Sequence, residues 1–284
     1  MKKPSKVRRV TVYVLGVLSM LTATVVTLLD YYYNDIIIWI WLLYGIVLVP
    51  LVLSSMVFFF DSLRLKTRFQ KVMFVWGVLN LLLTVIVIDA NHRIARAADP
   101  DEMVAYYHRN SDELRSLADY AYHAVNPGQW MYLEFERGEV SIFSVPGLHE
   151  SYENINVEAC CREVGLSREE FDEIRRRLEM LDCISVELSR SPEIKPSVLS
   201  DLVAQRDTGY VDIGRVRWMM SKYDFRIYLA PMSDSVWNHL LSPSCCELIP
   251  VCDSMALLYG SPAFGSTCFP NRDQYIKKWN LVER

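Results

Sequence analysis

The sequence predicts a membrane-anchored α+β protein, with three N-terminal transmembrane helices followed by a mixed domain of helices and antiparallel strands. Two observations support this prediction. Long uncharged apolar runs occur only in about the first 90 of the 284 residues. The remainder alternates between segments with the period of a helix and segments with the period of a strand. Hydrophobic residues make up 51% of the chain, which is a high content for a protein without membrane segments.

Three runs have the length that a helix needs to cross about 30 Å of hydrocarbon. They cover residues 10–29, 36–60 and 72–88, and none contains a charged residue. We therefore predict an anchor over residues 1–89. A cleaved signal peptide is the alternative for the first run, because the chain begins with the basic segment MKKPSKVRR. The segment TLLDYYYND is a poor cleavage site and a second apolar run follows at once, so we favour the anchor.

The charges beside the runs predict how this anchor is oriented. Nine basic residues precede the first run or lie between the second and the third, whereas the loop 30–35 has none. By the positive-inside rule, the N terminus is expected in the cytoplasm and residues 89–284 are expected to be extracytoplasmic. The sequence thus predicts a multi-pass protein of the bacterial inner membrane, with the lipid bilayer as one partner.

After the anchor we expect a linker over residues 90–100 and an α+β domain over residues 101–284. A helical pattern runs from Asp101 to Val125 and ends at the sequence NPG. The segment WMYLEFERGEVSIFSV alternates like a β-hairpin with its turn at RG. Further strands are expected at 184–188, 210–218, 225–229 and 255–259, and further helices at 235–241 and after Asn271, which is the expected N-cap.

Residues 155–188 form the most distinctive pattern in the domain. Apolar residues at helical spacing precede Gly165, which ends a first helix, and Ser167 with Glu170 forms a capping box for a second helix. Phe171, Ile174 and Leu178 form the buried stripe of that second helix, and a strand follows. This order resembles the winged helix-turn-helix, and the resemblance implies that the second helix reads DNA.

The charge of the domain argues against DNA binding. From Asp89 onward the chain holds 21 basic and 31 acidic residues, a formal balance of −10. Binding to phosphates needs basic side chains that are free. Asp172 and Glu173 lie one turn before Arg176 and Arg177, where ion pairs within the helix form. We therefore expect the helix pair to be a packing unit and the domain not to bind nucleic acid.

All seven cysteines lie in the domain. We expect at least one disulfide among Cys245, Cys246, Cys252 and Cys268, because an extracytoplasmic location permits disulfides and these four lie close together in the sequence. Buried reduced thiols are one alternative. A zinc site with His239 is another, although the chain has no C-x2-C pair.

The chain offers little catalytic machinery. Its five histidines lack the spacing of a metal-binding motif, and YGSPAFGS lacks the lysine of a phosphate loop. We assign no catalytic residue, no cofactor and no metal ligand. The sequence favours an integral membrane protein whose extracytoplasmic domain is a binding module for a protein partner or for a second copy of the chain. The alternatives are a membrane-anchored cytoplasmic regulator that uses residues 155–188 as a winged helix-turn-helix, and a membrane-anchored Cys/His enzyme.

Overall fold

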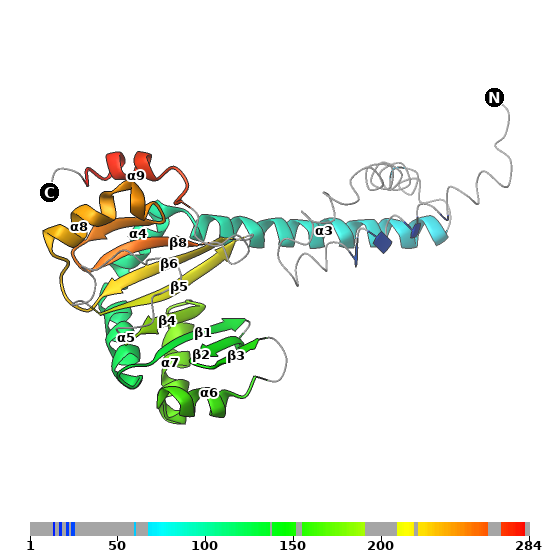
Figure 1. Cartoon of the computed structure of the whole chain (residues 1–284). Helices are drawn as coiled ribbons and strands as arrows, with labels where there is room; N and C mark the ends of the chain where they lie inside the picture. Colours follow the sequence, from blue (N-terminus) through cyan, green and yellow to red (C-terminus); the bar gives the residue numbers. More distant parts are fainter. Residues whose placement is uncertain are drawn as a thin grey trace. The chain divides into compact units, whose positions relative to one another are not determined.

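The structure is a computed structural model that describes residues 68–136, 138–151, 155–190, 209–218, 221–260 and 268–281, together with eight single positions before residue 68. The chain divides into two compact units, residues 1–93 and 94–284. The second unit is an α+β domain. Its eight described strands form one antiparallel sheet in the order β3-β2-β1-β4-β5-β6-β8-β7 (Figure 1).

The strands are short and alternate with groups of helices along the chain. They are β1 (Trp130–Glu136), β2 (Glu139–Val145), β3 (Leu148–Ser151), β4 (Ser185–Ser189), β5 (Tyr210–Trp218), β6 (Ser221–Tyr228), β7 (Leu248–Cys252) and β8 (Met255–Gly260). The helices of this unit are α4 (Pro100–Arg109), α5 (Ser111–Ala124), α6 (Val157–Val164), α7 (Arg168–Met180), α8 (Asp234–Leu241), the short η2 (Pro243–Cys245) and α9 (Arg272–Lys278). One long helix, α3 (Arg68–Ala97), precedes them.

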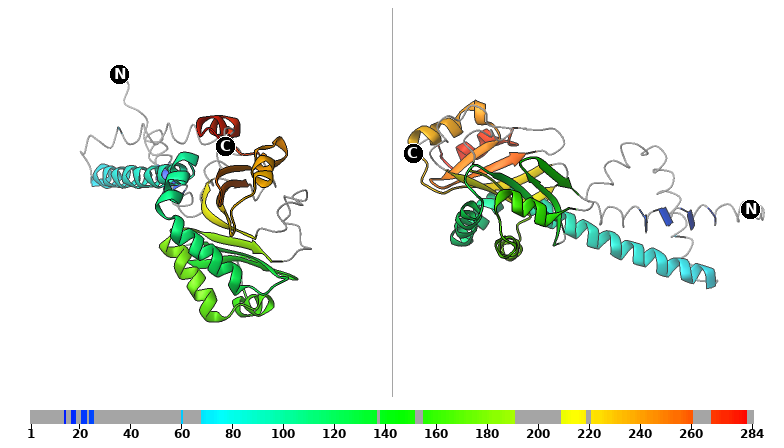
Figure 2. Two further views of the ribbon diagram at one scale, coloured as in Figure 1. Left: turned by 90° about the vertical axis from the view of Figure 1, so that its left-hand side faces the viewer. Right: turned by 60° about the horizontal axis from the view of Figure 1, so that its bottom comes forward.

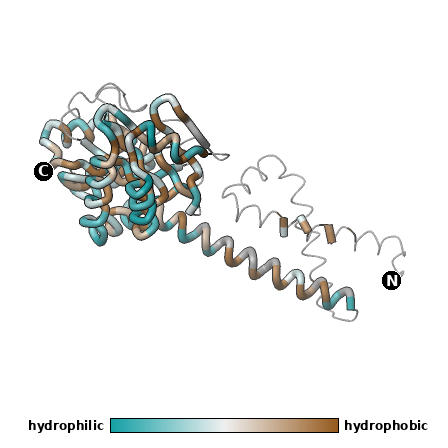
Figure 3. Tube along the Cα trace, turned by 90° about the horizontal axis from the view of Figure 1, so that it is seen from below, coloured by the Kyte–Doolittle hydropathy of each residue, from teal (hydrophilic) through white to brown (hydrophobic). Residues whose placement is uncertain are grey.

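The predicted membrane anchor is wrong. Among the residues that the structure describes, no helix has both the length and the apolar character needed to cross a membrane. The predicted third span lies in α3, where the uncharged run of about 17 residues is bounded by Lys71 and Asp89 and interrupted by Asn80. At 1.5 Å per residue this run rises about 26 Å, which is less than the roughly 30 Å of a hydrocarbon core. Figure 3 shows apolar residues along α3 after a hydrophilic start.

The other two predicted spans, 10–29 and 36–60, lie outside the described residues apart from single positions. A row of uncharged residues such as that in α3 is not sufficient for a span when it is shorter than the hydrocarbon core. The multi-pass placement in the bacterial inner membrane rested on all three spans, and so did the extracytoplasmic placement of residues 89–284. Both predictions are corrected together with the anchor.

The helix predicted from Asp101 to Val125 is two helices that meet at Asn110. Asn110 leaves the helical conformation with φ −124° and ψ 23°. Its side-chain amide donates a hydrogen bond to the carbonyl of Tyr106 at 2.9 Å, and its backbone N–H donates to the same carbonyl. Asparagine competes for backbone partners in this way, which explains why a continuous apolar period is broken here.

One face of the sheet is apolar and packs against helices. Its central row is formed by residues that pair across the strands and are almost fully buried, namely Phe143, Leu133, Val186, Ile213, Phe225, Leu257 and Ile249. Helix α5 lies against β4, β5 and β6, and α6 lies against β2. Figure 2 shows α5 and α7 side by side next to these strands. This layer is the hydrophobic core of the domain.

The predicted hairpin and helix pair are present. β1 and β2 pair as an antiparallel hairpin, with a bulge after Glu134. The predicted capping box of α7 is confirmed, since Ser167 and Glu170 cap each other reciprocally. Gly165 ends α6 in the left-handed conformation, with φ 76°. A Cβ at this position would lie 1.9 Å from the side chain of Asn126, so glycine is required both by conformation and by space.

The arginines of α7 are held in ion pairs. Glu173 pairs with Arg177 at 2.7 Å, as the i,i+4 spacing predicts, and also with Arg176 at 2.7 Å. Asp172 pairs instead with Arg168, at 3.2 Å. The buried side of the helix carries the predicted stripe of Phe171, Ile174 and Leu178. The helix pair therefore packs on the core through its apolar side while its charges pair with one another.

Replacing Leu178 by alanine should lower the free energy of unfolding by about 2 to 5 kcal/mol, because the substitution leaves a cavity under α7. Leu178 exposes only 1% of its surface. Met180 on the same helix is 66% exposed and provides the matched control, Met180→Ala, for which we expect little change. Urea unfolding of both variants measures the difference. Equal losses would contradict the packing described for α7.

Candidate functional site

The second face of the sheet is formed by the residues that alternate with the core residues. On β5, Asp212 precedes the core residue Ile213, and on β6, Asp224 and Arg226 flank the core residue Phe225. Because successive side chains of a strand point to opposite faces, these polar residues share one surface. We call it the polar face and define it as Tyr132, Glu134, Ser185, Glu187, Tyr210, Asp212, Arg217, Lys222, Asp224 and Arg226.

The strand register brings these residues together from four strands. A first row across β1, β4, β5 and β6 consists of Tyr132, Glu187, Asp212 and Arg226. The neighbouring row consists of Glu134, Ser185, Gly214 and Asp224. Charged side chains of both signs thus lie on directly adjacent positions of the sheet.

Most of these charged groups are buried. Asp212, Asp224 and Arg226 each expose 3% of their surface, and Lys222 exposes 9%. Withdrawing an ionised group from water costs several kcal/mol unless it is paired and hydrogen-bonded. Burying the polar face therefore costs free energy unless each of its charges has a partner.

Two ion pairs lie across the β5–β6 side of the polar face. Arg226 donates from Nε and Nη2 to the two carboxylate oxygens of Asp212, at 2.8 and 2.7 Å, in the bidentate geometry that suits a guanidinium. Lys222 Nζ lies 2.9 Å from Asp224 Oδ2. Burial alone would lower the pKa of Lys222, but Asp224 and the neighbouring Tyr132 and Glu187 raise it above its ordinary value. Lys222 is therefore charged at neutral pH.

A third pair lies on the β1 side. Arg217 Nη2 donates to Glu134 Oε2 at 2.6 Å, and the hydroxyl of Tyr132 donates to the same oxygen. Burial is the main cause of a raised pKa at Tyr132, so its hydroxyl stays protonated. Lys222 Nζ also lies 4.6 Å from the centroid of the Tyr132 ring, within the range of a cation–π contact.

Glu187 is the exception among the four carboxylates of the polar face. It lies between Tyr132 and Asp212 in the register, and the described residues place no basic side chain within 4.0 Å of it. Burial is the main cause of its raised pKa, and the negative charges of Asp212 and Asp224 add to that increase while Lys222 opposes it. Glu187 is partly buried.

Unused hydrogen-bonding atoms surround Gly214, next to Glu187 on the polar face. A Cβ at Gly214 would lie 2.0 Å from Ser185 Oγ, so only glycine allows this serine to approach the strand. Within the described part of the chain, Ser185 Oγ and Asp224 Oδ1 are buried without a hydrogen-bond partner. Buried polar atoms of this kind are rare in native proteins and call for an explanation such as a ligand or an ordered water.

The cysteines considered as disulfide partners lie in different environments. Cys246 and Cys268 form a disulfide, which joins the segment after η2 to the start of the C-terminal segment. Cys245 is a buried free thiol, and Cys252 is a free thiol beside Tyr107 and Ser254. His239 lies in α8, and no group of three or more His, Cys, Asp or Glu side chains arranged to hold a metal occurs among the described residues.

The sequence interpretation missed the polar face completely. The strands Tyr210–Trp218 and Ser221–Tyr228 alternate charged and apolar residues, and this pattern is normally interpreted as one core side and one solvent side. The signal that could have revealed the site is the match of opposite charges, since Asp212 of β5 stands opposite Arg226 of β6. That match depends on the register, which the sequence does not fix.

No protein-family model, no curated protein and no solved structure matches the chain. The function must therefore be argued from the site itself.

Replacing Asp212 by leucine should lower the free energy of unfolding by about 3 to 5 kcal/mol, because it leaves the buried Arg226 without its partner. The double variant Asp212→Leu/Arg226→Met should recover most of that loss, because both charges are then gone. Asp172→Leu, in the exposed pair with Arg168, is the control and should change stability little. A double variant no better than the single one would show that Asp212 acts through something other than this pair.

The stability of the protein should depend on pH through Glu187. Its folded-state pKa lies above the ordinary 4.5, so the folded state holds the proton more tightly than the unfolded state. Stability is then lost as the pH rises from 4.5 through the folded pKa. Glu187→Gln avoids this loss, so it should be more stable than the parent protein at pH 7 and equal to it in acid. Urea unfolding across this pH range tests the sign, with the exposed Glu158→Gln as control.

Proposed function

We propose that the α+β domain binds a small organic cation, a primary amine or a guanidinium, on the polar face of its sheet. The observation that carries the proposal is the unequal pairing of the four carboxylates. Glu134, Asp212 and Asp224 each have a basic partner, whereas Glu187 has none within the described residues. A ligand with one positive charge would give Glu187 a basic partner as well.

The surroundings of Glu187 favour a cation with an organic body. Tyr132 lies opposite Glu187 on β1, and Tyr210 lies close enough for the charge of Glu187 to influence its pKa. Each ring already accepts a cation, since Lys222 lies over Tyr132 and Arg226 lies 4.1 Å from the centroid of Tyr210. The rings beside Glu187 thus already stabilise positive charge.

The hydrogen-bonding groups also fit an amine. Ser185 Oγ and Asp224 Oδ1 offer acceptors next to Glu187, and an ammonium or guanidinium group carries several N–H donors. A neutral or anionic guest would leave Glu187 uncompensated. The energetic argument is the same, because three bases balance three of the four acids, and one more positive charge would compensate an ionised Glu187.

This proposal retains the prediction of a binding module and replaces the expected protein partner by a small cation. The arrangement on α7 does not favour the DNA-reading alternative, because Arg168, Arg175, Arg176 and Arg177 all have carboxylate partners. The expectation that the domain does not bind nucleic acid stays a prediction.

Calorimetric titration of the full chain with n-butylamine at pH 7 tests the proposal, because this amine is fully protonated there. We expect saturable binding, and roughly tenfold weaker binding or none for 1-butanol, which has no charge. Glu187→Gln should weaken butylammonium binding by roughly tenfold or more. Glu158→Gln removes an exposed carboxylate on α6 and should leave it unchanged. Butanol binding as tight as the amine, or an unaffected Glu187→Gln variant, would refute the proposal.

A further inference from the structure

The guanidinium of Arg226 has a buried donor that the ion pair with Asp212 does not use. Its Nε and Nη2 donate to Asp212, and within the described residues its Nη1 is buried without a hydrogen-bond partner. Tyr228 lies beside the guanidinium on the same strand and does not take up this donor. Arg226 exposes only 3% of its surface, so bulk water does not satisfy Nη1 either. An unsatisfied buried donor of a charged group costs free energy and calls for an acceptor.

The guanidinium of Arg226 lies near the carboxyl group that the proposed cation would meet. Arg226 reaches from β6 across to Asp212 on β5, and Asp212 stands next to Glu187 of β4 in the same row of the sheet. Neighbouring strands are about 4.8 Å apart, so a group at Glu187 and a group at the guanidinium are separated by roughly 5 Å. Tyr210, whose ring centroid lies 4.1 Å from the guanidinium, is only partly buried, as is Glu187. One small molecule is therefore long enough to contact both residues.

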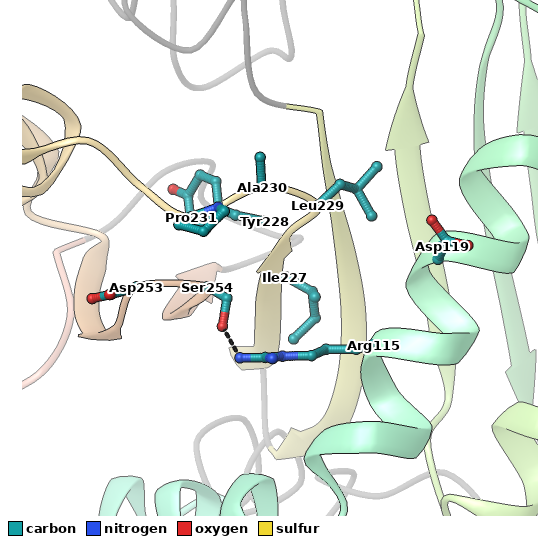
Figure 4. Close-up of a pocket in the computed structure, with 9 residues that line it drawn as sticks. All are labelled: Arg115, Asp119, Ile227, Tyr228, Leu229, Ala230, Pro231, Asp253 and Ser254. Carbon is teal, nitrogen blue, oxygen red and sulfur yellow. Dashed lines mark hydrogen bonds between the residues drawn. The ribbon is translucent and has the colours of Figure 1, made fainter.

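A second guanidinium, that of Arg115, is the less suitable partner for an acceptor. Its Nε donates to Tyr107 Oη at 3.2 Å and its Nη2 donates to Ser254 Oγ (Figure 4). Arg115 borders a pocket of about 390 Å³ on the helical side of the sheet, between α5, the residues that follow β6, and the turn between β7 and β8. Arg115 is exposed, so water satisfies its remaining donors. The buried Arg226 therefore gains more from an acceptor than Arg115 does.

The charges of the polar face decide which kind of acceptor fits Arg226. A carboxylate on the ligand would be repelled by Asp212, which already binds the same guanidinium. It would also add a negative charge to a face on which Glu187 has no basic partner within the described residues. An ether, hydroxyl or carbonyl oxygen accepts a hydrogen bond without adding charge. The complementary acceptor is therefore a neutral oxygen atom.

We propose that the ligand of the polar face is bifunctional. Its cationic group pairs with Glu187, and a neutral oxygen on the same molecule accepts a hydrogen bond from Arg226 Nη1. Amino alcohols, amino ethers and amino amides have this chemistry. The inference rests on the proposed binding of a cation at Glu187, and it adds the acceptor that distinguishes one such cation from another.

Calorimetric titration of the full chain with 3-methoxypropylamine and with n-pentylamine at pH 7 tests the inference. The two amines have the same charge and the same chain length, and they differ in one ether oxygen that replaces a methylene group. We expect the ether to bind roughly tenfold tighter, as for the gain of a hydrogen bond to a charged group. Saturable binding of both amines without a preference for the ether would overturn the inference and leave the cation site intact. Binding of neither amine would refute the cation site and the inference together.

Two variants assign the acceptor to Arg226. Arg226→Lys keeps a positive charge beside Asp212 and lacks Nη1, and Asp212→Leu/Arg226→Met removes both members of the pair. In both we expect the preference for the ether to disappear while n-pentylamine still binds, because Glu187 is unchanged. Arg115→Gln is the control and should keep the full preference, and circular dichroism establishes that each variant is folded. A preference that survives in both Arg226 variants, or is lost in Arg115→Gln, would refute the assignment to Arg226.

Discussion

The ion pair between Asp212 and Arg226 fixes how the two central strands of the domain lie against each other. The two residues stand directly opposite in the ladder between β5 and β6, and both are almost completely buried. Side chains alternate between faces, so a slip of one residue in β6 would turn Arg226 into the helical layer and Phe225 onto the polar face. Either displacement would leave a buried charge without its partner. Charge pairing therefore specifies the register more strictly than apolar packing alone would.

The pairing of charges distinguishes the polar face from a sheet face that only packs against its neighbours. A sheet face of apolar residues would be at least as stable, because buried ion pairs roughly offset their own desolvation. Around Glu187 the compensation is incomplete, and burial together with Asp212 raises the pKa of its carboxyl. A perturbed, partly accessible carboxyl beside unused hydrogen-bonding atoms is the combination expected where a ligand takes part in the charge balance.

The sequence predicted those features whose cause is local. The capping box at Ser167 and the hairpin after Trp130 depend on residues a few positions apart, and both are present. The sequence analysis did not predict strand β7. This strand contains Pro250 and lies at the edge of the sheet, where proline is tolerated. The polar face could not be predicted, because the meeting of Glu187 with Asp212 depends on pairing between distant segments. The anchor was wrong because no helix among the described residues is both long and apolar enough to cross a membrane, and the uncharged run in α3 is shorter than a hydrocarbon core.

Strand β6 separates the polar face from the pocket on the helical side of the sheet. Arg226 belongs to the polar face, while the next residue, Ile227, lines the pocket beside Arg115. Energetic coupling between two sites requires an element with two alternative arrangements that both ligands influence. β6 is paired with β5 on one side and with β8 on the other over nearly its whole length, so a shift of one residue would break two ladders at once. A strand held in this way acts as a rigid wall, so a ligand on the polar face should not change the shape of the pocket on the other side.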